Sequence, residues 1–156
     1  MSNEFSEINL KAIGVVKNEM KETGVRPNIL DIVSEIELYD SYADGLDRLD
    51  EYSHIIVLYH YHMGSNQAPK PIRQHAHNKE SYPVVGIFAL RGSNRPNRIG
   101  LSMAKILKVG SNKVKVSGLD AIDGTPVIDI KPYIPRSDSI PDAKVSPWQM
   151  EWQKQS

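Results

Sequence analysis

The stretch LSMAKILKVGSNKVKVSGL, residues 101–119, decides the fold class. Two largely apolar runs flank the tripeptide Gly110-Ser111-Asn112, whose residue types favour a tight turn. After this turn lysine and valine alternate, which places charged side chains on one face of a strand and apolar side chains on the other. The stretch therefore predicts a β-hairpin with one face in solvent.

Strand-like runs also lie on both sides of this hairpin. They are short, apolar and rich in β-branched residues, and they span residues 8–16, 32–39, 54–63, 84–90 and 127–130. The polar, proline-containing segment 64–82 is typical of a long loop. The sequence shows no internal repeat and no long amphipathic helix.

Only two short helices are expected. One begins near residue 40 and directs Leu46 and Leu49 inward, and the other carries Trp148 and Trp152 one turn apart. Strands therefore dominate. We expect an all-β protein, a single closed or partly closed β-barrel with a few short helices, unlike the alternating α/β sheet of a Rossmann fold.

Length and composition limit the class of protein. The 156 residues fit one domain, and we assign residues 1–145 to the β-barrel and 146–156 to a C-terminal tail or short helix. The absence of cysteine excludes thiol catalysis, disulfides and cysteine-type zinc sites. No apolar run is long enough for a membrane span, and the N-terminus lacks a secretory signal pattern. We therefore expect a cytoplasmic protein with no membrane partner.

Charge is distributed unevenly along the chain. Lysine plus arginine number 19 and aspartate plus glutamate number 19, so binding to nucleic acid by bulk charge alone is excluded. Residues 31–51 carry eight acids and one base, whereas residues 81–119 carry seven bases and no acid. The pattern fits either two solvated faces or a local basic patch for phosphates.

Histidines occur in two closely spaced pairs. His60 and His62 lie two residues apart in a predicted strand, and His75 and His77 repeat the spacing in the following loop. Such pairs could chelate a metal, since imidazole is a common ligand for zinc, copper and iron. Alternatively, they could form hydrogen bonds at a strand end, contact a substrate or lie on a loop surface.

Two further motifs carry polar residues between apolar runs. FALRGSNRPNRIGLS, residues 88–102, holds three arginines within eight residues, which suits a carboxylate or a phosphate, or else an exposed loop with arginine–acid pairs. SGLDAIDGTPVIDIKPYIP, residues 117–135, has Asp120 and Asp123 bracketing a turn. Paired carboxylates can bind ribose hydroxyls, an amine or a cation, or simply cap the turn. The glycine-rich GxG and Walker A motifs are absent, so any nucleotide must be held in another way.

Together these motifs resemble the TsaA/TrmO family of S-adenosylmethionine-dependent tRNA methyltransferases. That family looks like FATRSPxRPNPIGLS followed by GLDLLDGTPVLDIKPYIP, with a preceding strand that ends in SHxxxLxxFH. In this chain the matching stretches are FALRGSNRPNRIGLS, GLDAIDGTPVIDIKPYIP and SHIIVLYHYHM, residues 53–63. AIGVVKNE, residues 12–19, is similar to the family's first strand, and the resemblance covers about residues 8–145.

The resemblance implies a non-Rossmann β-barrel that acts as a homodimer. It also implies N6-methylation of the threonylcarbamoyladenosine beside the anticodon, with S-adenosyl-L-methionine as cofactor, the tRNA anticodon stem-loop as partner and no metal. Carried over by position, the cofactor site would consist of His62, Met63, Arg91, Arg95, Asn97, Gly100, Leu101, Asp120, Ala121, Ile122 and Asp123. His62 and Asp120 are the candidate catalytic residues, and the candidate RNA contacts are Arg95, Arg98, Lys105 and Lys108.

The chain departs from the family pattern at several positions. Leu90, Gly92-Ser93, Arg98 and Met63 replace threonine, Ser-Pro, proline and glutamine, and Val25-Arg26-Pro27 only echoes an N-terminal Pro-Arg-Gln element. These departures leave two alternatives open. The chain could methylate another substrate, or it could be a non-enzymatic barrel that binds a metal or ligand through its histidine pairs.

Overall fold

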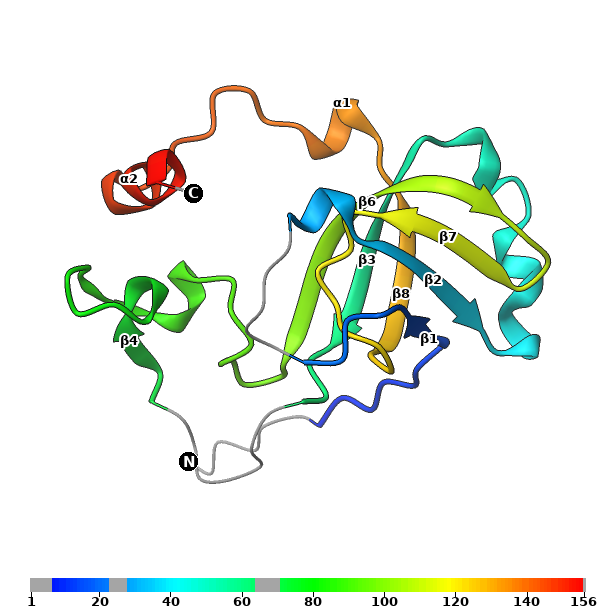
Figure 1. The fold of residues 1–156 in the computed structure, drawn as a ribbon, viewed down its shortest axis with the longest axis horizontal. Helices are drawn as coiled ribbons and strands as arrows, with labels where there is room; N and C mark the ends of the chain where they lie inside the picture. The colour runs from blue at the N-terminus through cyan, green and yellow to red at the C-terminus, as the bar shows by residue number, and fades with distance from the viewer. Residues whose placement is uncertain (1–6, 23–27, 64–70, 156) are drawn as a thin grey trace. The chain divides into compact units, whose positions relative to one another are not determined.

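The computed structural model describes residues 7–22, 28–63 and 71–155 (Figure 1). The Val25-Arg26-Pro27 element and the first part of the predicted long loop lie outside the described residues. The chain forms two compact units, Met1–His62 with Leu101–Tyr133 and Met63–Gly100 with Ile134–Ser156. Each unit is described separately below, and the predicted domain division at residue 145 stays a prediction.

The first unit is built around a closed barrel of six strands. In order around the barrel these are β1 (Gly14–Lys17), β2 (Val33–Leu38), β7 (Lys113–Ser117), β6 (Ile99–Val109), β3 (His54–His60) and β8 (Pro126–Pro132). The pairs β1–β2, β2–β7, β7–β6, β3–β8 and β8–β1 are antiparallel. The predicted all-β barrel with few short helices is confirmed.

The barrel core follows from the alternation of side chains along each strand. Val16, Ile36, Val57, Val114 and Val127 come from five different strands, and all are fully buried. Burying a side chain of this size stabilises the fold by roughly 1.5–3 kcal/mol. The core is therefore lined mainly from the strands around it, with Leu46 of a 3-10 helix added, and no long helix among the described residues contributes to it.

The predicted hairpin is confirmed as β6 and β7. Its turn is closed by the Gly110 amide, which donates to the Lys113 carbonyl over 2.7 Å. Along β7, Val114 and Val116 are fully buried while Lys113 and Lys115 are exposed. The lysine–valine alternation therefore does place one face of this strand in solvent.

The short helix expected near residue 40 is a 3-10 helix, η2 (Asp40–Leu46), followed by η3 (Leu49–Glu51). Leu46 is buried and Leu49 packs against the core, as expected. A third 3-10 helix of this unit, η1 (Ile29–Asp31), precedes β2.

The predicted first strand was too long. Only Gly14–Lys17 forms a strand, whereas Ile8 and Leu10 are 80% and 58% exposed. The strand ladder begins at Gly14, opposite Leu38 and Val127, and the backbone of Ile13 is the first to bond to both sides, to Val127 and Tyr39. Apolar composition alone did not reveal where pairing begins.

The second unit contains a separate two-stranded sheet of β4 (Arg73–His75) and β5 (Val84–Gly86). Its helical elements are η4 (Ala76–Asn78), η5 (Ile87–Ala89), α1 (Pro135–Asp138) and α2 (Pro147–Gln155). Of the buried strand expected over 84–90, only Val84–Gly86 forms a strand, and it is not buried; Ile87–Ala89 form a 3-10 turn and Phe88 is 79% exposed. The segment expected to be a loop contains β4 and η4.

Aromatic packing ties α2 to η4 within this second unit. The His77 ring stacks on Trp152 at 4.1 Å between centroids and meets Trp148 and Tyr82 edge-on. Lys79 lies over the Trp152 ring at 4.6 Å. The two tryptophans noted in the sequence therefore serve as the contact surface of α2. In the part of the chain that the structure describes, no helix has the length and apolarity to cross a bilayer.

Candidate functional site

The turn that joins β7 to β8 is the polar feature most firmly held in the barrel. We call residues 120–123 the 120–123 turn. It is flanked by Gly118 and Gly124, whose φ angles of +85° and +80° lie in the left-handed region that glycine adopts readily. Ala121 and Ile122 are buried, whereas Asp120 is exposed. The turn therefore anchors its apolar side chains in the barrel and leaves Asp120 outside.

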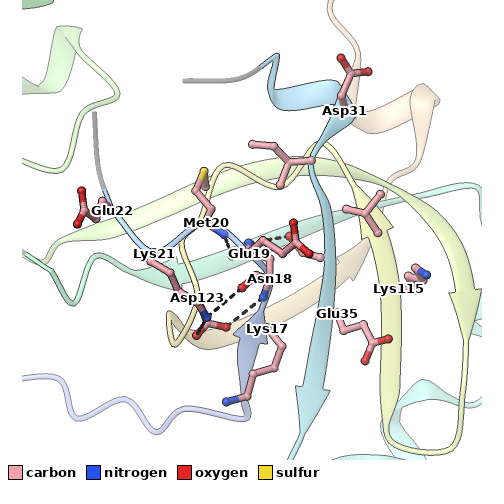
Figure 2. Close-up of a pocket in the computed structure, with 13 residues that line it drawn as sticks. Lys17, Asn18, Glu19, Met20, Lys21, Glu22, Asp31, Glu35, Lys115 and Asp123 are labelled. Carbon is pink, nitrogen blue, oxygen red and sulfur yellow. Dashed lines mark hydrogen bonds and ion pairs between the residues drawn. The ribbon is translucent and has the colours of Figure 1, made fainter. Parts of the chain in front are cut away.

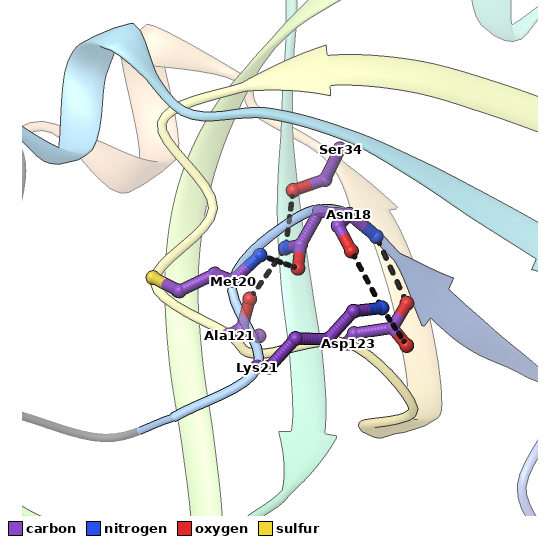
Figure 3. A network of polar contacts seen from close by, with 6 residues as sticks. All are labelled: Asn18, Met20, Lys21, Ser34, Ala121 and Asp123. Carbon is purple, nitrogen blue, oxygen red and sulfur yellow. Dashed lines mark hydrogen bonds and ion pairs between the residues drawn. The ribbon is translucent and has the colours of Figure 1, made fainter.

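Asn18, directly after β1, holds one side of this turn (Figure 3). Its side-chain amide donates to the Ala121 carbonyl over 2.8 Å and to the buried Ser34 hydroxyl over 2.9 Å. Its side-chain oxygen accepts from the Met20 amide over 3.0 Å. Asn18 thus links the segment after β1, strand β2 and the 120–123 turn.

Asp123 faces the same network. Its carboxylate accepts from the Asn18 backbone amide over 3.1 Å and from Lys21 Nζ over 2.6 Å (Figure 3). The Lys21 hydrogen bond, followed by that from the Asn18 backbone, lowers the pKa of this carboxyl. The Asp123 amide also donates to the Met20 carbonyl over 2.7 Å. Asp123 is therefore ionised at neutral pH and already engaged with its own chain.

Tyr59 and Ser102 hold the other side of the turn. The Tyr59 hydroxyl donates to the Asp120 carbonyl over 2.8 Å, and the Asp120 amide donates to Ser102 Oγ over 3.2 Å. The two hydroxyls are 3.2 Å apart. Because Tyr59 has one hydroxyl hydrogen and gives it to the carbonyl, Ser102 is the donor between them. Burial raises the pKa of Tyr59, which stays protonated.

His62 lies two residues beyond the end of β3, beside the turn. Its Nε2 atom is 3.7 Å from the point where a Cβ on Gly124 would sit. Its Nδ1 atom is buried and has no hydrogen-bond partner among the described residues. Burial, and then the neighbouring charge of His60, lower the pKa of His62. The structure therefore brings a neutral imidazole next to the 120–123 turn.

A cavity of about 970 Å³ opens beside this network (Figure 2). Its walls are residues 17–22 and 31–35, and Lys115 and Asp123 complete the lining. It shares Asn18, Lys21 and Asp123 with the contacts that hold the turn. A volume of this order suits a small ligand, but His62 and Asp120 are not among the residues that line it. No sequence motif pointed to this cavity, because the residues of its walls form no recognisable pattern.

The arginine-rich loop, residues 91–98, belongs to the second unit, and both Arg95 and Asn94 bind other residues of that unit. Arg95 Nη1 donates to the carbonyls of Leu90 and Gly92 over 3.0 and 3.2 Å. Asn94 donates to Gln74 Oε1 over 2.6 Å and to the Pro71 carbonyl over 3.3 Å. Part of the Arg95 guanidinium is thus used to shape its own loop.

The predicted cofactor residues divide between the two units. His62, Leu101 and the four residues of the 120–123 turn belong to the barrel unit. Met63, Arg91, Arg95, Asn97 and Gly100 belong to the second unit. Gly100 is buried, whereas Met63, Arg91, Asn97 and Leu101 are exposed. Of the predicted residues, the geometry therefore groups His62 with the turn.

The histidine pairs have separate surroundings. His75 Nδ1 lies 2.8 Å from the Tyr82 carbonyl and so carries a proton, and His77 stacks on Trp152. Among the described residues, no group of three or more histidine, aspartate or glutamate side chains could hold a metal ion. The aromatic and backbone contacts give His75 and His77 a packing role in the second unit.

The acidic segment 31–51 and the basic segment 81–119 lie partly side by side in the barrel, because strand β2 pairs with strand β7. In the register of β2 with β7, Glu35 lies opposite Lys115 and Glu37 opposite Lys113. Lys113 Nζ lies 3.7 and 3.6 Å from the Glu35 and Glu37 carboxylates. Lys105 and Lys108 are exposed on β6, one strand further along, and no described acid pairs with them.

Sequence reasoning missed the residues that hold the turn, namely Asn18, Tyr59 and Ser102. Asn18 lies in AIGVVKNE, Tyr59 in SHIIVLYHYHM and Ser102 at the end of FALRGSNRPNRIGLS. Each was therefore inside a stretch already singled out. What the sequence could not show is that all three meet one turn from three different strands or strand ends.

Comparison with known proteins decides the family. The profile of the tRNA-methyltransferase O N-terminal domain matches residues 16–139, which include the 120–123 turn, His62 and the arginine-rich loop. The chain belongs to this family. The resemblance inferred from the sequence motifs is therefore confirmed.

Relatives agree with this assignment. An S-adenosyl-L-methionine-binding protein of Archaeoglobus fulgidus is 42% identical over 134 residues, which cover 84% of this chain and 93% of that protein. The tRNA (adenine(37)-N6)-methyltransferase of Escherichia coli is 34% identical, with 91% of this chain and 64% of that protein covered. A crystal structure of TrmO from Pseudomonas aeruginosa superposes with a TM-score of 0.72 at 28% identity, covering 89% of this chain and 62% of that one. The chain thus spans less than two thirds of the E. coli and P. aeruginosa proteins and nearly all of the archaeal protein.

Proposed function

We propose that this chain is an S-adenosyl-L-methionine-dependent tRNA methyltransferase. Its proposed reaction is N6-methylation of the threonylcarbamoyladenosine beside the anticodon, carried out in the cytoplasm by a homodimer. The observation that carries the proposal is the family match over residues 16–139. The E. coli relative named as a tRNA (adenine(37)-N6)-methyltransferase supports the reaction, and the archaeal relative named for binding the cofactor supports the cofactor.

The polar groups around the turn fit such a cofactor. The buried His62 Nδ1 has no partner among the described residues, and no described residue forms a hydrogen bond or ion pair with the Asp120 carboxylate. A carboxylate suits a ribose hydroxyl or the positive charge of an amine or sulfonium. By position, Arg91 is proposed to bind the methionine carboxylate of the cofactor, since a guanidinium can donate two parallel hydrogen bonds to it. The remaining carried-over residues belong to the same proposed site, Asp123 as a member of the turn that carries Asp120.

When bound, the cofactor supplies a methyl group on a positively charged sulfur. The main contribution of the chain is to align donor and acceptor, which can contribute roughly 7–11 kcal/mol. The N6 nitrogen of a carbamoylated adenine is a poor nucleophile until it loses its proton. The lowered pKa keeps His62 neutral near pH 7, so a ring nitrogen can accept that proton. Asp120 is the alternative acceptor.

We propose that tRNA contacts the exposed bases Lys105 and Lys108, together with Arg95 and Arg98 of the arginine-rich loop. Lys113 is left out of this proposal because its ammonium group already lies near the carboxylates of Glu35 and Glu37. Replacing Lys108 by glutamine should lower the salt dependence of binding to an anticodon stem-loop by about one counterion. The matched change Lys113→Gln should leave the salt dependence nearly unchanged. Equal effects of the two changes, or a flat salt response of the unmodified protein, would contradict the assignment.

Mass spectrometry of nucleosides tests the function directly. The protein is incubated with the cofactor and a tRNA that carries threonylcarbamoyladenosine without the methyl group, and the tRNA is then digested. We expect one added methyl group on that nucleoside, and none in a matched tRNA with plain adenosine at the same position. Cofactor binding without methylation of either tRNA would favour another substrate. No cofactor binding at all would overturn the proposal as a whole.

A further inference from the structure

The two carboxylates of the 120–123 turn do not have equal surroundings. We propose that Asp120 is the carboxylate that contacts the cofactor, whereas Asp123 and Asn18 are positioning residues that hold the turn. This inference rests on the proposed function, because it assigns roles within the proposed cofactor site. It divides a pair of aspartates that sequence similarity treats alike.

The backbone of Asp120 is fixed on both sides of its Cα atom. Its carbonyl accepts from the Tyr59 hydroxyl, and its amide donates to Ser102 Oγ. Tyr59 and Ser102 are 1% and 7% exposed, so these hydrogen bonds are shielded from water. An exposed carboxylate on a fixed backbone position is oriented for a ligand without a further cost in backbone ordering.

The carboxylate of Asp123, in contrast, is occupied within its own chain. One oxygen accepts from the Asn18 backbone amide and the other from Lys21 Nζ. A cofactor that used this carboxylate would have to displace at least one of these donors. The geometry therefore favours Asp123 as an anchor between the turn and the segment after β1.

Asn18 completes the anchor because its backbone and side chain act on the turn together. The backbone amide binds Asp123, and the side-chain amide binds the carbonyl of Ala121, two residues earlier. The same side chain is fixed by Ser34 and Met20. Two points of the turn, two residues apart, are thus attached to one residue, which limits rotation of the turn about either bond.

Alanine and asparagine variants at the two positions distinguish the roles. The change Asp123→Asn keeps a side-chain oxygen that can accept from the Asn18 backbone amide, and it removes mainly the exposed ion pair with Lys21. We therefore expect cofactor affinity, measured by calorimetry, to fall by about tenfold for Asp123→Ala and by less than about threefold for Asp123→Asn. At position 120 the charge itself is the proposed contact, so Asp120→Asn and Asp120→Ala should both weaken binding by about tenfold or more.

Two measurements distinguish a displaced turn from a protein that is unfolded as a whole. Thermal unfolding of each variant shows whether it is folded, and backbone amide NMR shifts of residues 120–123 without cofactor show whether the turn has moved. We expect Asp123→Ala to shift these amides and the two Asp120 variants to leave them close to their original positions. If Asp123→Ala does not fold, the Asp120 pair and Asp123→Asn still decide the question.

The possible failures are distinct. A parent protein that binds no cofactor overturns the proposed function and this inference with it. A parent that binds, combined with near-normal affinity of Asp120→Asn, overturns the inference alone. So does a folded Asp123→Asn that binds as poorly as Asp123→Ala, because the charge at 123 would then be what the cofactor contacts.

Discussion

The 120–123 turn and the arginine-rich loop, residues 91–98, both carry family motifs, but different contacts hold them. The turn is held by Asn18 and Tyr59, which lie far from it in the sequence, and two of its four residues are buried. The loop is held by hydrogen bonds from Arg95 to carbonyls three and five residues away, and by an exposed bond and a part-buried bond from Asn94 to Pro71 and Gln74. The turn is therefore part of the barrel, whereas the contacts of Arg95 and Asn94 hold the loop within the second unit.

This difference bears on what each region can do in binding. A turn fixed by buried long-range hydrogen bonds presents its ligand groups in place, so little ordering accompanies binding. The loop carries three arginines, of which Arg91 is exposed and Arg95 and Arg98 are half-buried, and this concentration of positive charge suits contacts with a phosphate backbone. The following changes test this contrast between the two regions.

The largest difference in stability is expected between alanine variants of the two asparagines that hold these regions, Asn18 for the turn and Asn94 for the loop. Asn18→Ala leaves the buried Ser34 hydroxyl and the Ala121 carbonyl without their partner, which should lower the free energy of unfolding by about 2–4 kcal/mol. Asn94→Ala removes two exposed or half-exposed bonds and should cost less than about 1 kcal/mol. Urea denaturation of both variants measures the difference. Similar losses would mean that the turn is held no more firmly than the loop.

The second effect concerns the hydroxyl of Tyr59. Tyr59→Phe removes the donor to the Asp120 carbonyl in a buried position and should cost about 1–2 kcal/mol. Tyr39→Phe is the matched control, since Tyr39 is 50% exposed and its change should be neutral. Thermal unfolding compares the two variants. A neutral Tyr59→Phe would show that this side of the turn does not depend on the hydroxyl.

Glycine-to-alanine changes should alter the free energy of unfolding by smaller amounts, with a loss beside the turn and no loss in the loop. Gly124 has φ +80°, and a Cβ there would contact His62, so Gly124→Ala should cost about 1 kcal/mol. Gly92 in the loop has a negative φ and open space around it, so Gly92→Ala should be neutral or stabilising by up to about 1 kcal/mol. Denaturation midpoints report both changes. A loss at Gly92 as large as that at Gly124 would remove the contrast.

The smallest effect is electrostatic and concerns His62. Its pKa in the folded protein lies below the ordinary value of 6.5, so the unfolded chain binds the proton more readily. The contribution of His62 to stability is therefore complete above pH 6.5 and is lost as the pH falls through its folded pKa. His60→Gln removes one cause of the shift and should raise the pKa of His62, as followed by NMR titration of its ring. An unchanged titration would leave burial as the sole cause.

Much of the barrel could be predicted from local sequence patterns. The alternation of lysine and valine after Lys113 predicted strand, face and hairpin correctly, because side-chain direction depends only on strand geometry. Strand ends were less predictable, since Ile8 is apolar yet lies outside the paired region. Phe88 was also expected to be buried, although nothing local to its sequence specifies what covers it.

The candidate site, too, could be predicted only in part from the sequence. His62 and Asp120 were identified from motifs, and the structure places His62 beside the turn that carries Asp120. The role of Asn18 depends on contacts with Asp123 and Ala121, more than a hundred residues away in the chain. Such contacts follow from barrel closure, which no window of sequence contains.

The central claim is that the 120–123 turn is a preformed part of the cofactor site. Backbone amide NMR during titration with S-adenosyl-L-methionine tests this claim most directly. We expect the largest shifts at residues 119–124 and at His62, and the amides of the turn should be in place before the cofactor is added. Saturable binding that leaves these amides unchanged, with shifts confined to other parts of the chain, would contradict the account.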